Sequence, residues 1–318
     1  MFGGIGNDTV HWNSVDTGDV ADGGAGSDTL VIRFDFLGAS TTQPVAFALG
    51  PVTGCYVSGI FGLSAAKFER VEFYASDGDD ILSGGALGDQ LFGGKGSDTL
   101  SGLGGNDIIS TGTGNLVASG GGGSDLLVLD LSNNFEAILL RLTNAMSVST
   151  SLTVGSATGF EALNVVSGSG DDRLTGGDLG DSLNGGAGDD MLFGGLGADQ
   201  IITGGSDDGV LTTLFGGGTT HVTDFDHARD TIGLAGFTSL LPYGTLDPAR
   251  LLFGSFATAP AATLAGPQFF HDPTTGNLWQ DRNGTGAAPA VLVMVLDTNP
   301  LIGASDFVVA DWFDNALI

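Results

Sequence analysis

Aspartate recurs at a nine-residue spacing in several stretches of the chain, and each of these acids follows a glycine-rich segment. A tight turn there would expose backbone carbonyl oxygens beside the carboxylate. Carboxylate and carbonyl oxygens suit Ca²⁺, whereas Mg²⁺ demands stricter octahedral geometry and sheds its water reluctantly. The spacing therefore predicts a series of calcium sites. The predicted carboxylate ligands are Asp8, Asp28, Asp80, Asp89, Asp98, Asp107, Asp125, Asp172, Asp181, Asp190, Asp199 and Asp208.

These acids occupy the sixth position of a nine-residue unit, GGxGxDxUx, in which U is a large apolar residue. The unit reads GGIGNDTVH at 3–11, GGAGSDTLV at 23–31, GGKGSDTLS at 93–101 and GGAGDDMLF at 185–193. Glycine lets the chain turn tightly with positive φ. The turn glycines are therefore predicted to contribute carbonyl ligands. They are Gly4, Gly6, Gly24, Gly26, Gly94, Gly96, Gly186 and Gly188.

The elements that position these turns follow from the eighth residue of the unit. A fixed short period is typical of a solenoid, in which each repeat buries its apolar residue only by stacking on its neighbours. The last three residues of each unit are expected to form a short strand with the eighth pointing inward. These residues are Val10, Leu30, Leu82, Leu91, Leu100, Ile109, Leu127, Leu174, Leu183, Leu192, Ile201 and Val210.

Runs of this unit in strict register resemble the RTX, or haemolysin-type calcium-binding, family. The resemblance implies an all-β fold, a right-handed parallel β-roll or β-solenoid with β-rich spacers and a C-terminal β cap. One coil of such a roll takes two units, so residue i stacks on residue i+18. Asp80 would then stack on Asp98, whereas Leu116 replaces the acid one coil further on. Asp8 and Asp28 are 20 residues apart, which allows one coil with a small insertion.

Stacked carboxylates repel one another unless cations lie between them. The predicted cofactor is therefore Ca²⁺, in several copies, and folding is expected to depend on it.

The repeats are organised as a duplication. KFERVEFYASDGDDIL at 67–82 and GFEALNVVSGSGDDRL at 159–174 align at an offset of 92 residues, which pairs Phe68 with Phe160 and Glu69 with Glu161. One continuous solenoid with wider spacer coils is the simplest architecture, and separate rolls joined by spacers are the alternative. The predicted divisions are repeats at 1–31, a β-rich spacer at 32–74, a repeat block at 75–128, a second spacer at 129–166, a second block at 167–215 and a C-terminal region at 216–318.

Residues 216–318 contain HVTDFDHARDTIGL at 221–234 and end in ASDFVVADWFDNALI. These segments resemble the C-terminal regions of RTX proteins exported by type I secretion, which makes that apparatus an expected partner. A β-rich cap on the open end of the roll is the plainer interpretation, and both can hold together. The first residues show no signal peptide and begin inside a repeat. We therefore expect a C-terminal piece of a longer protein, or one truncated at its N-terminus.

Composition restricts the partners. The 318 residues include 56 Gly, and 37 acidic against 9 basic residues give a net charge of −28. Such acidity argues against nucleic acid and against anionic membrane surfaces. Cys55 is the single cysteine, so no intramolecular disulfide forms. The longest apolar run, near 287–296, is too short to span a bilayer.

Two further groups of polar residues leave alternatives open. The fifth-position residues Asn7, Asp79, Asn106, Asp171, Asp189 and Asp207 are outer ligands or solvated turn residues. Asp224, Asp226 and Asp230 form a further calcium site or cap a turn. Asp281 opens a segment that resembles part of an EF-hand loop but lacks its glutamate, which favours a hairpin turn.

Catalytic motifs are absent from the sequence. It contains no HExxH zinc motif, no GxSxG elbow and no Walker loop, and its four histidines lack metal-ligand spacing. We expect no enzyme activity and a secreted bacterial protein, extracellular or at the cell surface. Three roles stay open. They are a calcium-binding module that folds outside the cell, the secretion and folding tail of a larger enzyme or toxin, and an adhesin or surface-layer protein.

Overall fold

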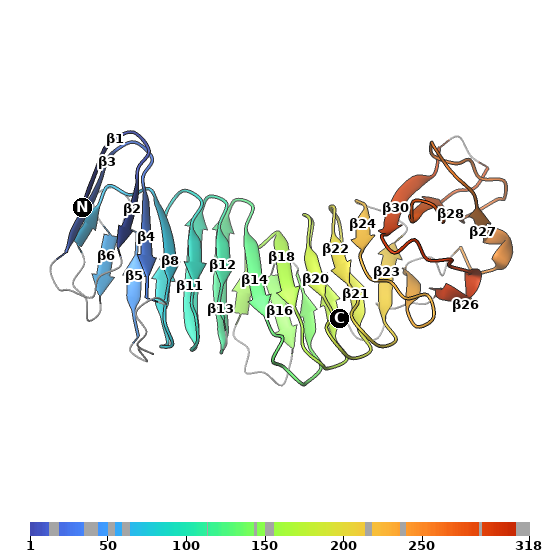
Figure 1. The fold of residues 1–318 in the computed structure, drawn as a ribbon, viewed down its shortest axis with the longest axis horizontal. Helices are drawn as coiled ribbons and strands as arrows, with labels where there is room; N and C mark the ends of the chain where they lie inside the picture. The colour runs from blue at the N-terminus through green and yellow to red at the C-terminus, as the bar shows by residue number, and fades with distance from the viewer. Residues whose placement is uncertain are drawn as a thin grey trace. The chain divides into compact units, whose positions relative to one another are not determined.

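The computed structural model describes most of the chain as β-strands joined by tight turns (Figure 1). The described residues are 1–12, 19–34, 44–49, 55–58, 64–112, 114–142, 145–149, 156–213, 218–235, 240–285 and 288–309. Within these ranges the only helices are short 3-10 turns, and none has the length and apolarity needed to cross a membrane.

The chain divides into two compact units. The first comprises Met1–Leu131 with Leu142–Asn164, and the second comprises Ser132–Arg141 with Val165–Ile318. The division therefore falls inside the second predicted spacer. In both units the strands fall into two sheets, and the glycine-rich turns carry the chain from one sheet to the other.

In the first unit, strands of the two sheets alternate along the chain. One sheet contains β1 (Phe2–Ile5), β3 (Val20–Ala25), β5 (Ala46–Ala48), β6 (Cys55–Ser58), β7 (Ser64–Ala66), β9 (Ile81–Ser83), β11 (Asp98–Gly104), β13 (Leu116–Gly122), β16 (Ala145–Ser149) and β17 (Ser156–Thr158). The other contains β2 (Thr9–Trp12), β4 (Thr29–Arg33), β8 (Arg70–Tyr74), β10 (Gln90–Phe92), β12 (Ile108–Ser110), β14 (Leu126–Asp130) and β18 (Ala162–Val166), the last of which ends in the second unit.

The second unit repeats this arrangement and extends it. One sheet contains β15 (Leu139–Arg141), β19 (Arg173–Thr175), β21 (Met191–Phe193), β23 (Gly209–Thr213), β25 (Thr231–Ala235), β26 (Gly244–Thr245) and β31 (Phe307–Val309). The other contains β20 (Ser182–Asn184), β22 (Gln200–Ile202), β24 (Thr220–Val222), β27 (Leu251–Phe253), β28 (Gln268–Asp272), β29 (Asn277–Asp281) and β30 (Val291–Leu296). The 3-10 helices are η2 (Pro248–Arg250) and η3 (Ala304–Asp306).

The register confirms the predicted stacking. Strands of consecutive coils pair in parallel, with Leu82 opposite Leu100 and Leu91 opposite Ile109, 18 residues apart. In the first coil Gly4 lies opposite Gly24, 20 residues apart. All twelve eighth-position residues are buried, from 0% exposed at Leu30 to 7% at Val10. Each contributes roughly 1.5–3 kcal/mol by leaving water, and this row of side chains forms the core.

The first spacer adds strands to the roll of the first unit. Its β5 and β7 pair in parallel with β9 and β3, and antiparallel β6 lies between them. Its last strand, β8, pairs in parallel with both β4 and β10.

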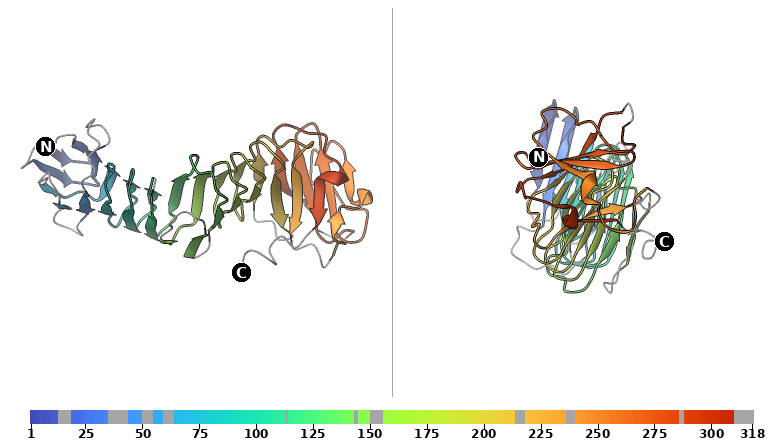
Figure 2. Two further views of the ribbon diagram at one scale, coloured as in Figure 1. Left: turned by 90° about the horizontal axis from the view of Figure 1, so that it is seen from below. Right: turned by 90° about the vertical axis from the view of Figure 1, so that its right-hand side faces the viewer.

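The C-terminal region closes the second unit as a β cap, as predicted. Strand β30 pairs in parallel with β24, and β31 with β25, so the roll continues directly into the cap. Beyond β30 the pairing becomes antiparallel through β29 and β28. These strands belong to the part of the chain coloured orange to red in Figure 2. Every residue of β28 is buried, and the rings of Phe269 and Phe307 lie 5.6 Å apart between the two sheets. Asp281 accepts hydrogen bonds from Asn283 and Gly284, which makes a turn between β29 and β30.

Candidate metal centre

Stacking brings the sixth-position aspartates into columns along the edges of the rolls, which we call ladders. Eleven of the twelve are buried, and Asp8 is half-buried. In each stacked pair, the backbone nitrogen of the first aspartate donates to Oδ1 of the second. The distances are 2.8 Å for Asp8–Asp28, 2.9 Å for Asp80–Asp98, 2.7 Å for Asp89–Asp107, 2.8 Å for Asp107–Asp125, 2.8 Å for Asp172–Asp190, 3.1 Å for Asp181–Asp199 and 2.8 Å for Asp190–Asp208.

The second carboxylate oxygen, Oδ2, lacks a hydrogen-bond partner in most of the ladder aspartates. In nine aspartates Oδ2 is buried and has no hydrogen-bond partner among the described residues. These are Asp8, Asp28, Asp80, Asp98, Asp107, Asp125, Asp190, Asp199 and Asp208. A buried charged oxygen without a partner costs several kcal/mol, so a series of them indicates cations between the turns.

Glycine at the first position of the unit lets the aspartate carboxylate and a carbonyl oxygen of the next coil lie close together. The point where a Cβ would stand on Gly185 lies 2.4 Å from Asp190 Oδ2 and 2.7 Å from the Thr203 carbonyl oxygen of the next coil. The same point on Gly102 lies 2.0 Å from Asp107 Oδ2 and 2.6 Å from the Gly120 oxygen. A Cβ would collide with both oxygens, so only glycine allows the carboxylate and the carbonyl oxygen to approach each other here.

The second- and fourth-position glycines shape the turn. Gly4, Gly24, Gly94 and Gly186 have φ between 85° and 121°, and Gly6, Gly26, Gly96 and Gly188 have φ between 114° and 151°. Successive coils approach closely here. A Cβ on Gly24 would stand 2.1 Å from the Gly4 oxygen, and one on Gly26 would stand 2.0 Å from the Gly6 oxygen. Glycine is required on both grounds, and the stacked turns align their carbonyl groups along the edge.

Burial raises the pKa of the ladder carboxylates. The pKa of Asp190 rises to about 8, because burial disfavours its charge and Asp172 and Asp208 add repulsion. Burial and the neighbouring acids raise the pKa of Asp98 and of Asp107 to about 7. The same causes raise the pKa of Asp80, Asp172 and Asp208 to about 6, and burial raises that of Asp199 to about 6. Carboxylates so poorly compensated favour a bound cation or a proton.

No group of three or more His, Cys, Asp or Glu side chains converges on one point in the described portion of the chain. Any metal site here must therefore combine carboxylates of adjacent coils with backbone carbonyl oxygens. That donor set fits Ca²⁺, which accepts six to eight oxygens in flexible geometry. It does not fit Zn²⁺, which prefers four nitrogen or sulfur ligands. When bound, the ion would offset the repulsion between stacked acids and connect one turn to the next.

Three ladder aspartates have a hydrogen-bond partner for Oδ2. Asp172 Oδ2 accepts from the Ser167 hydroxyl. Asp89 and Asp181 use a backbone donor instead. Their Oδ2 atoms accept hydrogen bonds from Gly85 and Gly177 at 2.6 and 2.7 Å. The two units read GGALGD and GGDLGD, with Leu at the fourth position. Neither Gly85 nor Gly177 adopts positive φ, so the turn directs an N–H inward. The fourth-position leucine is the sequence signal for this variant turn.

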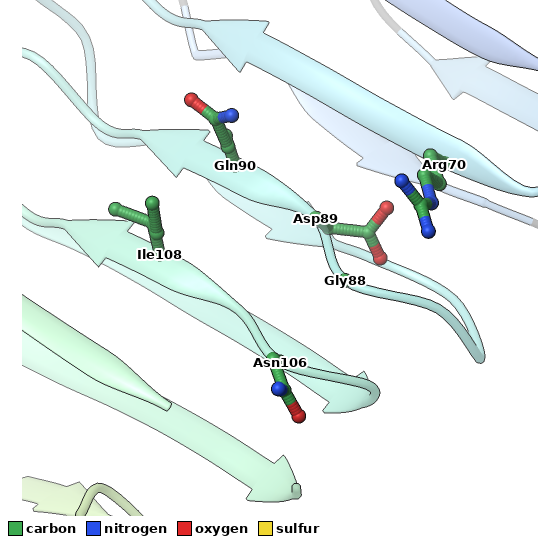
Figure 3. Close-up of a pocket in the computed structure, with 6 residues that line it drawn as sticks. All are labelled: Arg70, Gly88, Asp89, Gln90, Asn106 and Ile108. Atoms are coloured by element: carbon green, nitrogen blue, oxygen red, sulfur yellow. The ribbon is translucent and has the colours of Figure 1, made fainter. Parts of the chain in front are cut away.

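Asp89 also lies beside a cation of the protein. Figure 3 shows the Arg70 guanidinium next to the Asp89 carboxylate, in a depression lined by Gly88, Gln90 and Asn106. Burial raises the pKa of Asp89 to about 6, and its hydrogen bonds and Arg70 limit the rise.

The ladder contains members that the repeat pattern did not reveal. Glu69 and Glu161 accept hydrogen bonds from the backbone nitrogens of Asp28 and Asp125, both at 2.8 Å. Asp230 does the same for Asp208 at 3.2 Å. The duplication aligns both glutamates with each other. Neither lies in a GGxGxD unit, so the repeat pattern did not predict that they accept these hydrogen bonds.

The spacers also supply backbone donors at the start of each block. The nitrogen of Val45 donates to Asp80 at 2.6 Å, and that of Ile138 donates to Asp172 at 2.7 Å. Nothing in the sequence pattern marks these positions.

The other acids whose role the sequence left open accept hydrogen bonds from the backbone. Asp224 accepts from the nitrogens of Thr203 and Gly204, and Asp226 accepts from that of Ala228. Fifth-position side chains accept an outer, exposed row of hydrogen bonds from backbone nitrogens of the next coil. In one of them, the Ser27 nitrogen donates to Asn7 Oδ1 at 3.0 Å. Leu116 lies opposite Asp98 in the strand register, so this ladder lacks an acid there as predicted.

Comparison with protein-family models identifies the same repeats. The RTX calcium-binding nonapeptide repeat matches in four copies, at residues 72–91, 83–115, 166–201 and 175–210. No curated protein matches the chain. Among solved structures, the chain is similar to the extracellular lipase LipA from Serratia marcescens, with 16% identity and a TM-score of 0.22. That alignment covers 89% of this chain and 45% of the lipase. The buried aspartate ladders and the matched repeats lead to one assignment: residues 72–115 and 166–210 contain RTX calcium-binding nonapeptide repeats.

Proposed function

We propose that this chain is a non-catalytic module of a secreted bacterial protein, and that calcium outside the cell triggers its folding. The observation that carries the proposal is the series of buried Oδ2 atoms without hydrogen-bond partners in the described rolls. The chain also carries 37 acidic against 9 basic residues, so its own cations are too few to neutralise the ladders.

The energies involved support coupling between metal binding and folding. Two like charges about 4 Å apart repel by roughly 1 kcal/mol in bulk water and by about 4 kcal/mol at an effective dielectric of 20. Several such pairs compete with a net folding free energy of only about 5–15 kcal/mol. Calcium that binds the stacked turns, and not the unfolded chain, stabilises the fold by mass action.

The direct test is far-UV circular dichroism of the purified chain during calcium titration. We expect little β-structure in chelator and a cooperative gain of β-signal at sub-millimolar to millimolar Ca²⁺. Equal Mg²⁺ serves as the control and should produce little folding. A spectrum that stays unchanged when calcium is chelated would contradict the proposal.

The proposal also includes export through a type I apparatus. The chain would thread the transporter unfolded at low cytosolic calcium, and extracellular calcium would then fold it and oppose its return. Deleting residues after Phe253 tests this, with secreted protein as the measurement. The deletion also removes β28–β31, so a full-length F307D variant, which weakens the cap but keeps the tail, is the matched control. We expect the deletion to abolish export and F307D to retain it.

An adhesive role for the first spacer gains less support. Phe34 and Phe73 are 2% and 0% exposed, with ring centroids 5.6 Å apart. Tyr74 stacks on Phe92 at 4.5 Å. Phe36 and Phe61 lie outside the described residues. These aromatic side chains stabilise the roll rather than offer a binding surface, which favours the folding module.

A further inference from the structure

The chain contains four glutamates, and two of them occupy equivalent places where a repeat stack meets a spacer. Glu69 and Glu161 lie 92 residues apart and hold the same position relative to the preceding stack. Each accepts a hydrogen bond at 2.8 Å from the backbone nitrogen of the last aspartate of that stack, Asp28 or Asp125. In a regular pair the Oδ1 atom of the next aspartate makes this bond, so each glutamate replaces an aspartate.

A carbonyl oxygen accompanies each glutamate. In the regular pair Asp8–Asp28, a Cβ on Gly3 would stand 2.1 Å from the Gly23 oxygen and 2.9 Å from Asp8 Oδ2. At the first junction, a Cβ on Gly23 would stand 2.0 Å from the Lys67 oxygen and 2.8 Å from Asp28 Oδ2. The Lys67 oxygen therefore takes the place of the first-position carbonyl of a repeat.

The second junction has the same geometry. A Cβ on Gly120 would stand 2.0 Å from the Gly159 oxygen and 2.6 Å from Asp125 Oδ2. In both junctions the carbonyl oxygen and the carboxylate oxygen lie within 3 Å of one point that no side chain fills. Two independent copies of this arrangement show that it is a feature of the sequence.

The backbone is held in an unusual conformation to present this oxygen. Lys67 has φ of 59° and Gly159 has φ of 68°, both in the left-handed region. For lysine this conformation costs roughly 1–2 kcal/mol. Phe68 and Phe160, the next residues, are 5% and 4% exposed and anchor the turn in the core. A strained lysine whose carbonyl oxygen lies near a buried, unpartnered carboxylate oxygen is consistent with a binding role.

Each junction also contains a buried oxygen that needs a partner. Asp28 and Asp125 are 0% and 1% exposed, and their Oδ2 atoms have no hydrogen-bond partner among the described residues. We propose that Ca²⁺ binds at two junction sites, one formed by Asp28, Glu69 and the Lys67 oxygen, and one formed by Asp125, Glu161 and the Gly159 oxygen. The three-residue turn x-Phe-Glu thus replaces a whole GGxGxD turn. This inference rests on the proposed calcium-dependent folding.

The test is to count the calcium bound per chain in E69Q, E161Q and the double variant, by equilibrium dialysis with isothermal titration calorimetry. Glutamine keeps a carbonyl oxygen that accepts the aspartate N–H, but it removes the charge that a cation needs. E136Q is the matched control, because Glu136 is exposed and belongs to no ladder. We expect one bound ion fewer in each single variant, two fewer in the double variant and no change in E136Q.

The outcomes separate the inference from the proposed function. If wild type binds several ions and folds, while E69Q and E161Q bind as many as wild type, the glutamates are only hydrogen-bond caps and the inference is wrong. If wild type binds no calcium, the proposed function fails and the inference with it. Circular dichroism at saturating calcium checks folding. If the double variant does not fold, the single variants decide by the same count.

Discussion

The Asp190 carboxylate lies directly against the backbone of Asp172 one coil earlier, with its Oδ1 atom 2.8 Å from the Asp172 nitrogen. Its Oδ2 atom is buried without a partner in the described structure. Burial, together with the neighbouring acids, raises the pKa of Asp190 to about 8. A proton and a calcium ion therefore compete for this carboxylate near neutral pH.

The metal-free protein should become more stable as the pH falls. The pKa of Asp190 is raised to about 8 and that of Asp98 and Asp107 to about 7, against an ordinary value of 3.8. The folded state therefore binds more protons than the unfolded state between about pH 8 and pH 4. Stability contributed by these groups is present at low pH and lost as the pH rises through the folded-state pKa values.

Circular dichroism in chelator across this pH range measures the effect, and the β-signal should grow toward about pH 5. Calcium affinity should fall over the same interval, because protonation removes ligands. A calcium affinity that is constant between about pH 8 and pH 6 would contradict this prediction.

Substituting the first-position glycine should damage the fold and the calcium site together. In G185A, the new Cβ would stand 2.4 Å from Asp190 Oδ2. We expect a loss of roughly 1–3 kcal/mol in the free energy of unfolding with calcium present, measured by denaturant titration. Gly205 is the matched control, since a Cβ there meets nothing within 4 Å and its φ is not left-handed. G205A should stay within about 0.5 kcal/mol of wild type, and equal losses in both variants would refute this explanation.

Restoring the missing acid should add a calcium site. Leu116 lies opposite Asp98, whose Oδ2 atom is buried and has no partner among the described residues. We predict that L116D binds one ion more per chain than wild type by calorimetry. The control V117D adds the same charge at an exposed neighbouring position and should leave the count unchanged. A wild-type calcium complex with full occupancy beside Leu116 would show that no acid is needed there.

The two kinds of turn should respond differently to loss of charge. Asp89 has both oxygens hydrogen-bonded, to the nitrogens of Val71 and Gly85, whereas Asp107 Oδ2 has no partner in the described rolls. We expect D107N to weaken calcium binding more than D89N, with the change in calcium midpoint of folding as the measurement. Equal shifts in the two variants would mean that the variant turn opens and binds calcium as the others do.

The sequence predicted the stacking well because a strict period leaves one register that buries every eighth residue. The pairing of Leu82 with Leu100 and of Asp98 with Leu116 follows from that period together with the two-unit coil that the RTX resemblance implies. The period does not predict whether each Oδ2 atom has a hydrogen-bond partner, because this depends on the φ angles of the turn. The sequence shows Leu87 at the fourth position. Only the structure shows that the turn then directs the Gly85 N–H toward Asp89.

The ends of the stacks were hidden for a different reason. Glu69 and Glu161 act at the places where the period stops, so no repeat template could include them. Asp230 lies 22 residues beyond Asp208 rather than 18, and this longer coil kept it out of register in the sequence. Hydrogen bonds from the backbone, such as that from the Val45 nitrogen to Asp80, do not depend on residue type, so the sequence cannot predict them.

The repeated junction has an implication for how such proteins change length during evolution. Each spacer offers a backbone N–H to the acid that follows, from Val45 or Ile138, and a glutamate to the acid that precedes. Removing residues 69–160 would join Phe68 to Glu161 and recreate the same local sequence at the seam. Gain or loss of a whole 92-residue module would therefore keep the same contacts between spacer and repeat stack. Unequal recombination could change the number of modules in this way without requiring a new interface.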